Sequence, residues 1–478
     1  MHTHHAVRQL ALPLLALLAA LLGTGGGLPA AVSPETGQAP DTWQALGLEG
    51  APSPRSYATT VWTGTEFIVW GGMGPVATWP QQTALYHDGY RYNPATGTWR
   101  LMSTVGAPSP RLNATGIWTG SELIIWGGND FSSPLPLSPA MGGGRYDPVT
   151  DTWHALPPSG LSPRGASTVI WTGKELLVWG GTMDAPSATP GEMRWFSQSD
   201  GARYDPVTNT WRRMSTVGAP DGKYRAIWTG KELLVWSASP EAYQQSQHTP
   251  GHPGARYDPA TDTWRPMSAV GAPPASAMAA VWTGTQLLVW GAANGQDARY
   301  DPVTDTWTPM SMVNAPTPRI SAMVTWTGRQ MLVWGGCCAP PHSGHGGFDV
   351  DGGLYDPRTD TWTPIGDANG AVAPESYATA WTGSQLVVWG GCCNPPGTTL
   401  GTGSRYDSTS GHWVSLPAAG APTPRYGATA IWTGREVLLW GGYHNTTLLS
   451  DGATYRLASP PPRSPDREKE RPPASIGR

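Results

Sequence analysis

Residues 163–213 read PRGASTVIWTGKELLVWGGTMDAPSATPGEMRWFSQSDGARYDPVTNTWRR. Two apolar runs, 167–171 and 175–179, are joined by Thr-Gly-Lys, which is a hairpin signal. A third short strand is expected at Arg203-Tyr204. It is followed by Asp-Pro-Val-Thr-Asn, a turn in which Pro presets φ and Asn tolerates the left-handed region. Thr210-Trp211 then opens a fourth strand, so this stretch predicts one antiparallel four-stranded unit.

The same unit recurs eight times. A second Trp stands eight residues after each Trp-Thr-Gly, and a Tyr follows each second Trp. In seven units a third Trp stands seven residues after that Tyr. The Trp-Thr-Gly triplets begin at Trp62, Trp118, Trp171, Trp228, Trp282, Trp326, Trp381 and Trp432. This period of about 53 residues is typical of propeller blades or solenoid turns.

The eighth unit lacks the third Trp, whereas Trp43 stands alone before the first unit. We expect the segment around Trp43 to supply the missing fourth strand, because joining the two ends would leave no exposed sheet edge. The sequence therefore predicts an all-β, eight-bladed propeller within residues 34–457. Each blade has four antiparallel strands, and the N-terminal strand closes the ring.

The repeat resembles the kelch motif in three features: an apolar run ending in Gly-Gly, then Tyr-Asp-Pro-x-Thr-x-Thr-Trp, then Pro-Arg. Ser237-Ala238 and Gly291-Ala292 replace the glycine pair in units four and five. The resemblance covers residues 41–457 and implies a kelch-type β-propeller, in the superfamily of rings that includes galactose-oxidase-like proteins. Such rings include both enzymes and binding proteins, so the fold does not decide the activity.

Two terminal segments are predicted to lie outside the propeller. Residues 1–33 have the pattern of a secretory signal peptide: Arg8, then the apolar run Leu10 to Leu22, then small residues. An uncleaved anchor is the alternative. No later segment is apolar enough to enter a membrane, so the mature chain is expected to be secreted, periplasmic or extracellular. The Pro-rich, charged tail 458–478 is expected to be disordered.

Composition narrows the class of protein. The 478 residues include 26 Trp but only 4 Phe, and this Trp content excludes a disordered chain. Only 13% of the residues are charged and the formal net charge is −4. Without a basic cluster in the body, we expect no nucleic-acid partner. We also expect a monomer.

One connection varies between units. The segment between the second and third strands runs from 6 to 21 residues, while the first-to-second Trp spacing and the Tyr-to-third-Trp spacing are constant. In an up-and-down blade these segments share a face with the blade-to-blade connections; we call it the long-loop face. Variable loops on a rigid scaffold are common ligand sites. The aromatic residues in these segments are candidate contacts, and the alternative is that the indoles pack onto the blade edge: Trp79, Phe131, Trp195 and Phe196.

The Pro-Arg motif supplies a recurrent arginine at the start of each innermost strand: Arg55, Arg111, Arg164, Arg319 and Arg425. Two roles are open for it. The arginines form an anion-binding ring at the channel mouth, or they donate hydrogen bonds to carbonyls of the neighbouring blade. Lys223, Ala275 and Glu375 stand at this position in the other units.

Two adjacent cysteine pairs, Cys337-Cys338 and Cys392-Cys393, follow Trp-Gly-Gly in units six and seven. In a secreted chain we expect disulfides, either one clamp across the blades or two vicinal bridges. A thiolate metal site with His342 or His345 is the rival. Calcium or a transition metal bound by His342, His345, Asp349 and Asp351 is a further possibility. Asp351 also fits an Asp-Gly pattern that recurs before the third strand, so we expect neither a metal nor another cofactor.

Residues for catalysis do not stand out. No Ser-His-Asp or paired-carboxylate arrangement is evident, so we identify no catalytic residue. We therefore expect a secreted binding or interaction module that recognises a protein or glycan through its long-loop face. The alternative is a carbohydrate-active enzyme, a copper oxidase or a sugar isomerase, with its site at the channel mouth. Tyr443-His444 is the pair that would fit copper.

Overall fold

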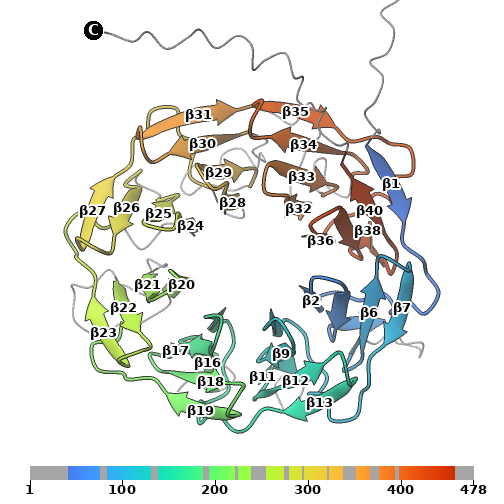
Figure 1. Ribbon diagram of the computed structural model, residues 1–478, viewed down its shortest axis with the longest axis horizontal. Coiled ribbons are helices and arrows are strands. Elements are labelled where there is room, and N and C mark those ends of the chain that lie inside the picture. The colour runs from blue at the N-terminus through green and yellow to red at the C-terminus, as the bar shows by residue number, and fades with distance from the viewer. Residues whose placement is uncertain are drawn as a thin grey trace, which may run out of the picture. The chain divides into compact units, whose positions relative to one another are not determined.

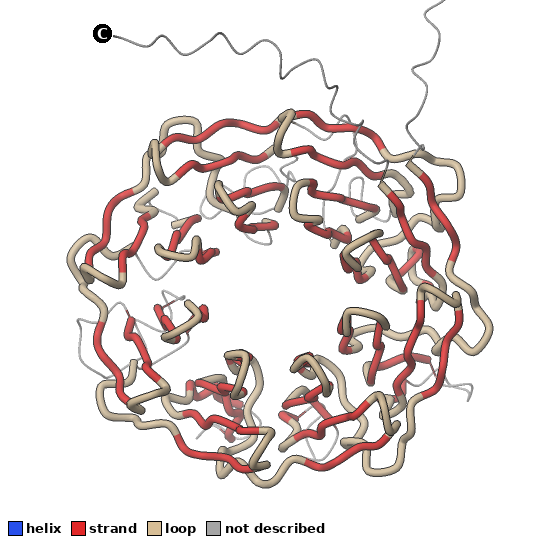
Figure 2. Tube along the Cα trace, in the orientation of Figure 1, coloured by secondary structure: helices blue, strands red, loops and turns tan. Residues whose placement is uncertain are grey.

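The computed structural model describes residues 41–75, 83–130, 138–186, 193–220, 224–237, 254–273, 279–292, 295–319, 322–336, 351–366, 376–392 and 398–457. All regular secondary structure in these ranges is β-strand (Figure 2). None of the described residues forms a helix long and apolar enough to cross a membrane. The signal peptide and tail predicted at the two ends lie outside the described ranges.

Eight antiparallel four-stranded sheets surround a central axis (Figure 1), which confirms the predicted propeller. The first blade runs outward through β2 (Thr59–Trp62), β3 (Phe67–Trp70), β6 (Gly89–Asn93) and β7 (Thr98–Leu101). The next six blades follow in chain order: β8 (Thr115–Trp118), β9 (Leu123–Trp126), β12 (Gly143–Asp147), β13 (Thr152–Ala155); β14 (Thr168–Trp171), β15 (Leu176–Trp179), β18 (Gly201–Asp205), β19 (Thr210–Arg213); β20 (Tyr224–Trp228), β21 (Leu233–Ser237), β22 (Gly254–Asp258), β23 (Thr263–Pro266); β24 (Ala279–Trp282), β25 (Leu287–Trp290), β26 (Ala298–Asp301), β27 (Thr306–Pro309); β28 (Met323–Trp326), β29 (Met331–Trp334), β30 (Gly352–Asp356), β31 (Thr361–Ile365); β32 (Ala378–Trp381), β33 (Gln385–Trp389), β34 (Gly403–Asp407), β35 (His412–Ser415).

The eighth blade joins the two ends of the chain. Its strands are β36 (Thr429–Trp432), β37 (Val437–Trp440), β40 (Gly452–Arg456) and, at the outer edge, β1 (Thr42–Ala45). Trp43 is paired with Tyr455 across the β1–β40 ladder. Its ring lies 4.7 Å from that of Trp389 in the seventh blade, and its Nε1 donates to the Pro417 carbonyl at 3.0 Å. The predicted closure by the N-terminal strand is therefore confirmed.

The core lies between blades. Most second strands are apolar runs buried on both faces; Leu176–Trp179 in β15 is one example. Leu177 and Trp179 form a cluster with Leu233 and Val235 of the next blade, and seven comparable clusters complete the ring. Since each cluster draws on two sheets, a single blade cannot bury its own apolar surface.

One set of polar contacts repeats at four blade boundaries, where Asp151, Asp262, Asp305 and Asp360 each accept a serine N–H from the preceding exit segment. In the second blade, Trp153 Nε1 donates to the Ser103 carbonyl of the first blade's exit segment at 2.8 Å. The Asp151 carboxylate accepts the Ser103 N–H at 3.0 Å and the Tyr146 hydroxyl at 2.5 Å. Asp151 adopts φ 55°, the left-handed conformation that the turn composition predicts. The turn between the third and fourth strands is therefore also a contact between blades.

Within the described residues, four blades carry an extra two-stranded ribbon that the sequence did not predict. The ribbons are β4 (Met73–Pro75) with β5 (Thr83–Leu85), β10 (Asn129–Asp130) with β11 (Ser138–Pro139), β16 (Thr182–Pro186) with β17 (Met193–Ser197), and β38 (Tyr443–His444) with β39 (Thr447–Leu448). Each continues the segment after the second strand, in blades one, two, three and eight. These blades are consecutive around the closed ring (Figure 1).

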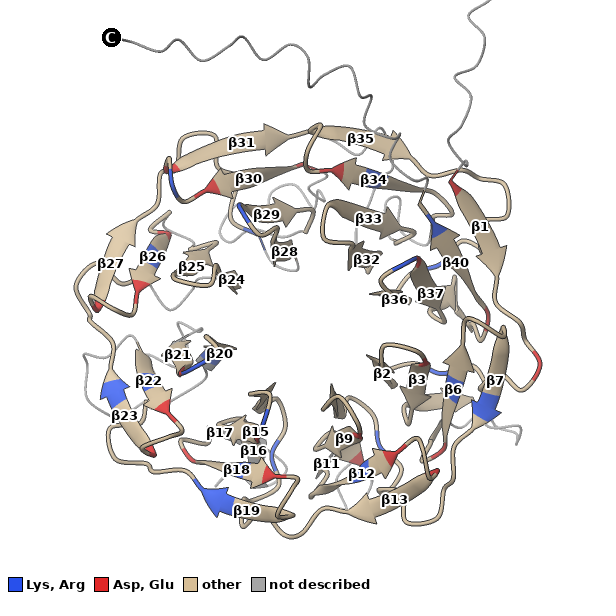
Figure 3. Ribbon diagram, viewed as in Figure 1, with Lys and Arg blue, Asp and Glu red and all other residues tan. Residues whose placement is uncertain are grey.

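Each ribbon is tied to the blade-to-blade connection that enters its blade. Isolated bridges join Ser56 to Met73, Leu112 to Asn129, Gly165 to Thr182, and Tyr426 to Tyr443. The variable segments and the blade-to-blade connections therefore lie together on one face, as predicted for the long-loop face. Charged residues of both signs are interspersed around the described ring, without a block of either sign (Figure 3).

Trp43→Ala should weaken the whole ring. Because Trp43 is only 8% exposed and packs on the seventh and eighth blades, its removal should cost about 3–5 kcal/mol of unfolding free energy. Urea unfolding followed by Trp fluorescence would measure the change. Leu48→Ala, at a side chain that is 62% exposed in the same segment, is the matched control and should change little. Equal effects of the two substitutions would contradict closure through Trp43.

Candidate functional site

The five Pro-Arg arginines are buried beneath the long-loop face. Their exposures range from 1% to 4%. In four blades the guanidinium donates to the carbonyl of the first residue of the Gly-Gly pair: Arg55 to Gly71 at 3.1 Å, Arg111 to Gly127 at 2.9 Å, Arg164 to Gly180 at 3.2 Å, and Arg425 to Gly441 at 3.0 Å. We call this position the arginine slot.

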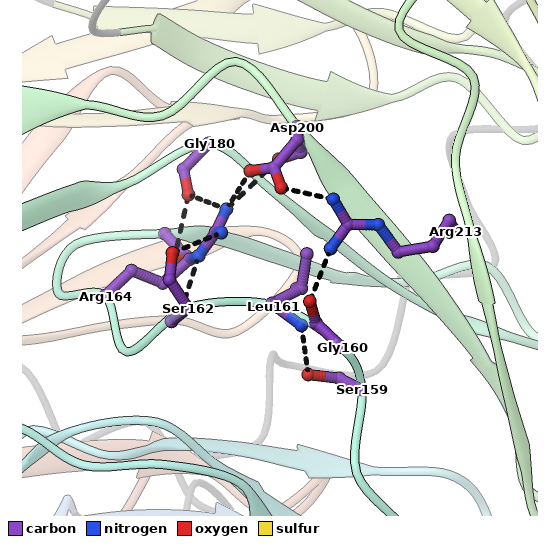
Figure 4. Close-up of polar contacts among 9 residues, drawn as sticks. Ser159, Gly160, Leu161, Ser162, Arg164, Gly180, Asp200 and Arg213 are labelled. Atoms are coloured by element: carbon purple, nitrogen blue, oxygen red, sulfur yellow. Dashed lines mark hydrogen bonds and ion pairs between the residues drawn. The ribbon is translucent and has the colours of Figure 1, made fainter.

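Figure 4 shows the slot of the third blade. Arg164 Nη1 donates to the Gly180 carbonyl at 3.2 Å and to Asp200 Oδ1 at 2.6 Å. Its Nε and Nη2 donate to the backbone carbonyl and hydroxyl of Ser162, both at 3.0 Å. On the other side of the carboxylate, Arg213 Nη2 donates to Asp200 Oδ2 at 2.6 Å. The Arg164 donors are thus used within its own blade.

An aspartate completes the slot in three further blades. Arg55 pairs with Asp88 at 2.9 Å, Arg319 with Asp351 at 2.6 Å, and Arg425 with Asp451 at 3.0 Å. In the second blade, Arg111 instead donates to the Gly142 carbonyl at 3.3 Å. Buried guanidinium groups with these partners are poorly placed for an anion in the channel.

The geometry thus favours the structural role over an anion-binding ring, with one correction to the expected partners. The groups that accept hydrogen bonds from each guanidinium belong to the arginine's own blade. The contact with the neighbouring blade is made by the backbone carbonyl of the arginine. Gly72 donates its N–H to the Arg111 carbonyl at 2.8 Å, and Gly391 donates to the Arg425 carbonyl at 2.9 Å. The motif therefore fixes both the turn within a blade and the spacing between blades.

The charges of this network shift the pKa of Asp200. Burial alone would raise it, but the hydrogen bonds and positive charges of Arg164 and Arg213 outweigh burial and hold the pKa below its ordinary value. In the second blade, burial lowers the pKa of Arg111, and the nearby Asp130 carboxylate opposes that shift. The carboxylates thus stabilise the buried guanidinium groups in their charged form.

The predicted aromatic contacts are only partly described. Trp195 and Phe196 lie on β17, in a ribbon strand opposite Asp184 and Met183, and not in an irregular loop. Trp79 and Phe131 lie outside the described residues. Sequence analysis missed this ribbon strand, although Pro190-Gly191, just before Met193, is a turn signal.

The predicted metal and cysteine sites fall mostly outside the description. His342, His345, Asp349, Cys337, Cys338 and Cys393 are not described. Asp351 is engaged with Arg319, as the repeated Asp-Gly pattern suggests. Within the described ranges no three His, Cys, Asp or Glu side chains gather as a metal site would require. Cys392 is buried, and the predicted disulfides remain predictions.

The Tyr443-His444 pair lies on ribbon strand β38. Tyr443 stacks on Tyr426 with ring centroids 5.3 Å apart. The Nδ1 of His444 lies 2.8 Å from the Pro424 carbonyl, which fits an Nδ1–H donor. Both residues therefore fasten the eighth ribbon to the connection that enters its blade.

Sequence analysis missed Asp297. In the other seven blades the third strand opens with a glycine: Gly89, Gly143, Gly201, Gly254, Gly352, Gly403 and Gly452. A Cβ at Gly201 would lie 2.5 Å from the Val178 carbonyl oxygen and 2.6 Å from the Trp179 ring. Asp297 takes this position in the fifth blade, and β26 accordingly starts one residue later, at Ala298. The signal was present in the repeat as Asp-Ala-Arg-Tyr in place of Gly-x-Arg-Tyr.

The Asp297 side chain turns into the fifth blade and is 1% exposed. Its Oδ1 accepts the Ala292 N–H at 2.8 Å. Among the described residues, no donor contacts its Oδ2. Burial raises the pKa of Asp297 to about 6, although hydrogen bonds from the N–H groups of Ala292 and Gly291 act in the opposite direction. This carboxyl is therefore a buried acid without a cationic partner in the described structure.

Arg164→Met should destabilise the fold, because it removes the guanidinium donors to Asp200 Oδ1 and to the backbone carbonyls of Ser162, Gly180 and Asp200. We expect a loss of about 3 kcal/mol in unfolding free energy, the lower end for a broken buried pair. Arg213→Met removes the exposed partner of the same carboxylate and should cost less than about 1 kcal/mol. Chemical denaturation of both variants makes the comparison; an unchanged Arg164→Met protein would contradict the structural role.

Asp297→Asn tests the raised pKa of the buried carboxyl. The folded carboxyl keeps its proton up to about pH 6, whereas the unfolded one releases it near its ordinary pKa of 3.8. Ionisation therefore lowers the unfolding free energy as the pH rises from about 4 to about 6. The Asn variant should gain up to about 3 kcal/mol over the parent above pH 7, and this gain should disappear below pH 4. A pH-independent difference would contradict the assignment.

A comparison with known protein families agrees with the architecture. The family model described as KLHDC2/KLHL20/DRC7 Kelch-repeats domain matches residues 39–226, which cover the closing strand and the first blades. The Gly-Gly, Tyr and Trp positions of the matched part recur in the remaining blades. The structure is thus a β-propeller of eight antiparallel four-stranded blades, of which residues 39–226 match a kelch-repeat family model.

Proposed function

We propose that this propeller is an interaction module without catalytic function, which binds a protein partner through its long-loop face. Kelch β-propellers are typically protein-interaction modules. The observation that carries the proposal is the run of four ribbons on consecutive blades, from the eighth through the third. These four ribbons lie on the face that carries the blade-to-blade connections, and each is bridged to the connection that enters its blade.

The opposite face offers much less variety. The turns between first and second strands lie on this face and repeat one geometry. In two of them, Glu66 and Glu122 donate their N–H groups to the Thr63 and Thr119 hydroxyls, each at 2.9 Å. Five glutamates of these turns pair with third-strand arginines, as Glu66 does with Arg91 at 3.5 Å. Uniform turns present nearly the same chemistry in every blade. Recognition of one partner needs differences between blades, and the ribbons and variable segments supply them.

The β16–β17 ribbon is the leading contact region. It is the longest of the four ribbons, with five paired positions from Thr182–Ser197 to Pro186–Met193. Its second strand contains Trp195 and Phe196, and large aromatic residues are common anchors of protein interfaces. The ribbon is joined to the Gly165 connection, so a partner seated there would rest on a fixed support.

Secretion and disulfide bonding belong to this proposal. The pattern of residues 1–33 supports export, and export would place the two adjacent cysteine pairs in an oxidising compartment. A glycan remains the second candidate ligand, because aromatic side chains such as those in the variable segments can also stack on sugars. The partner assay below separates a protein from a glycan.

Shortening the β16–β17 ribbon should abolish partner capture. Residues 183–196 are replaced by Asn-Gly, which closes a two-residue hairpin between the paired Thr182 and Ser197. The full chain is immobilised and exposed to the extracellular proteins of its source, and captured proteins are quantified by mass spectrometry. We expect at least about tenfold less of the principal partner, as for removal of an interface hot spot. The melting temperature should stay nearly unchanged.

Val207→Asp is the matched control. Val207 is 89% exposed on a turn between third and fourth strands, away from the ribbons, so capture should persist. Loss of capture in the control alone would place the interface on the other face. Saturable binding on a glycan array without protein capture would replace the protein partner by a glycan. Stoichiometric copper in the purified protein would contradict the non-catalytic role.

A further inference from the structure

Tyr57 is an exposed tyrosine on the connection that enters the first blade, and its side chain is 59% exposed. The other tyrosines whose side chains the structure describes pack on an aromatic ring or a guanidinium group, as Tyr146 does on Trp153 and Tyr86 on Arg55. Among the described residues, the Tyr57 ring has no such partner and its hydroxyl makes no hydrogen bond. Tyr57 therefore contributes little to the stability of the core.

The backbone of Tyr57 is in the left-handed conformation, with φ 55°. The residues five positions before the Trp of Trp-Thr-Gly in four other blades share it: φ is 54° at Asn113, 51° at Ala166, 55° at Ser376 and 63° at Gly427. We call these five residues the mouth arc. Consecutive members are joined through the backbone, since Asn113 donates its N–H to the Tyr57 carbonyl at 3.0 Å and Gly427 to the Ser376 carbonyl at 2.6 Å.

Glycine is the residue that adopts this conformation most easily, whereas a bulky side chain at such a φ is rare. The eighth blade has Gly427 at this position, and the first blade has Tyr57. The steric cost of a tyrosine there is not offset by burial of its ring. Strain that packing does not explain points to a role outside the fold.

The mouth arc lies on the long-loop face, just before the innermost strands, which surround the axis of the ring (Figure 1). It spans consecutive blades from the seventh through the third, and Tyr57 is its middle member. All five side chains are exposed and none is charged. Gly427 and Asn113 flank Tyr57 and are smaller, so a partner has room to approach the Tyr57 ring.

We propose that Tyr57 anchors an uncharged loop of the protein partner, which packs an apolar side chain on the ring and hydrogen-bonds the hydroxyl. The inference rests on the proposed function, since it names the residue and the kind of segment that meet on the long-loop face. Tyrosine suits this role because it combines a large apolar surface with a polar end, and it is enriched among interface hot spots.

An uncharged loop is favoured by the charges around the mouth arc. The slot arginines nearest in sequence, Arg55 and Arg111, are buried and donate to acceptors of their own blades. A charged group brought onto the arc would lose water and meet no opposite charge among the five arc residues. The arc therefore selects against a charged segment.

The backbone beside Tyr57 is held firmly. Ser56 exchanges two backbone hydrogen bonds with Met73 of β4, each at 2.9 Å, and this ties the connection to the first ribbon. The Tyr57 backbone thus needs little further ordering when a partner binds, which favours affinity.

The test uses the immobilised full chain and a phage library of random dodecapeptides as the probe. Enriched peptides are synthesised, and calorimetry measures their dissociation constants. We expect enriched peptides without a consensus Asp, Glu, Lys or Arg. Their affinity should change less than about twofold between about 0.05 M and about 0.5 M NaCl, because salt screens attraction between exposed charges only.

Three variants separate the anchor from a structural tyrosine. Tyr57→Gly should bind the peptides at least about tenfold more weakly, and its melting temperature should rise by about 1 °C because glycine relieves the strained φ. Ala166→Gly is the matched control: it relieves the same φ in the third blade, so its melting temperature should also rise while peptide affinity is unchanged. Tyr57→Phe keeps the ring and should keep the affinity within about threefold.

Undiminished peptide affinity in Tyr57→Gly would overturn the proposal, as would a lower melting temperature of that variant. Enrichment of charged peptides whose affinity falls steeply with salt would overturn the uncharged loop. Neutral oligosaccharides bound by the parent and lost in Tyr57→Gly, with no peptide enriched, would replace the protein by a glycan. These results differ from failure of the proposed function. A partner captured equally by the parent and Tyr57→Gly removes only the anchor, whereas a parent that captures no protein and enriches no peptide removes both.

Discussion

The structure depends on the packing of each blade's second strand against the blades on both sides. These strands are too apolar to face water, and their neighbours are other sheets of the same kind. An open row of such blades would be unstable at both ends, because its first and last blades would each expose an apolar face to water. The ring solves the problem by closing on itself, and Trp43 on β1 completes the last sheet.

The polar motifs serve that packing. Trp153, Tyr146 and Asp151 connect one blade to the exit segment of the blade before it. Arg164 and its counterparts hold the turn after the second strand, where a buried guanidinium supplies several donors at once to backbone carbonyls. Such a motif recurs in the sequence because each blade needs the same backbone groups satisfied, and recurrence alone therefore does not mark a binding site.

The fifth blade departs from this plan at two linked positions. Ala275 removes the slot arginine, and Asp297 replaces a glycine whose neighbours leave no room for a Cβ in the other blades. The backbone adjusts by starting β26 one residue later, and the carboxyl caps two N–H groups of the adjoining turn. A carboxyl placed there carries an unbalanced charge in a buried setting, which is the reason its pKa is raised.

Sequence alone determined the number of blades, the four strands of each, and the closing role of the Trp43 segment, because the eightfold spacing of Trp and Tyr reflects one local geometry repeated. It also located the variable face, since strand alternation assigns each connection to a side. Only the tertiary structure decided what the arginines do. An arginine that binds an anion at the channel mouth and one that donates hydrogen bonds within the fold would have the same place in the repeat, and they differ only in burial and hydrogen-bond partners. The ribbons pair segments that are close along the chain, but each is also bridged to the connection that enters its blade, and this support is not evident from the sequence. The burial of Asp297 likewise became visible only in the structure.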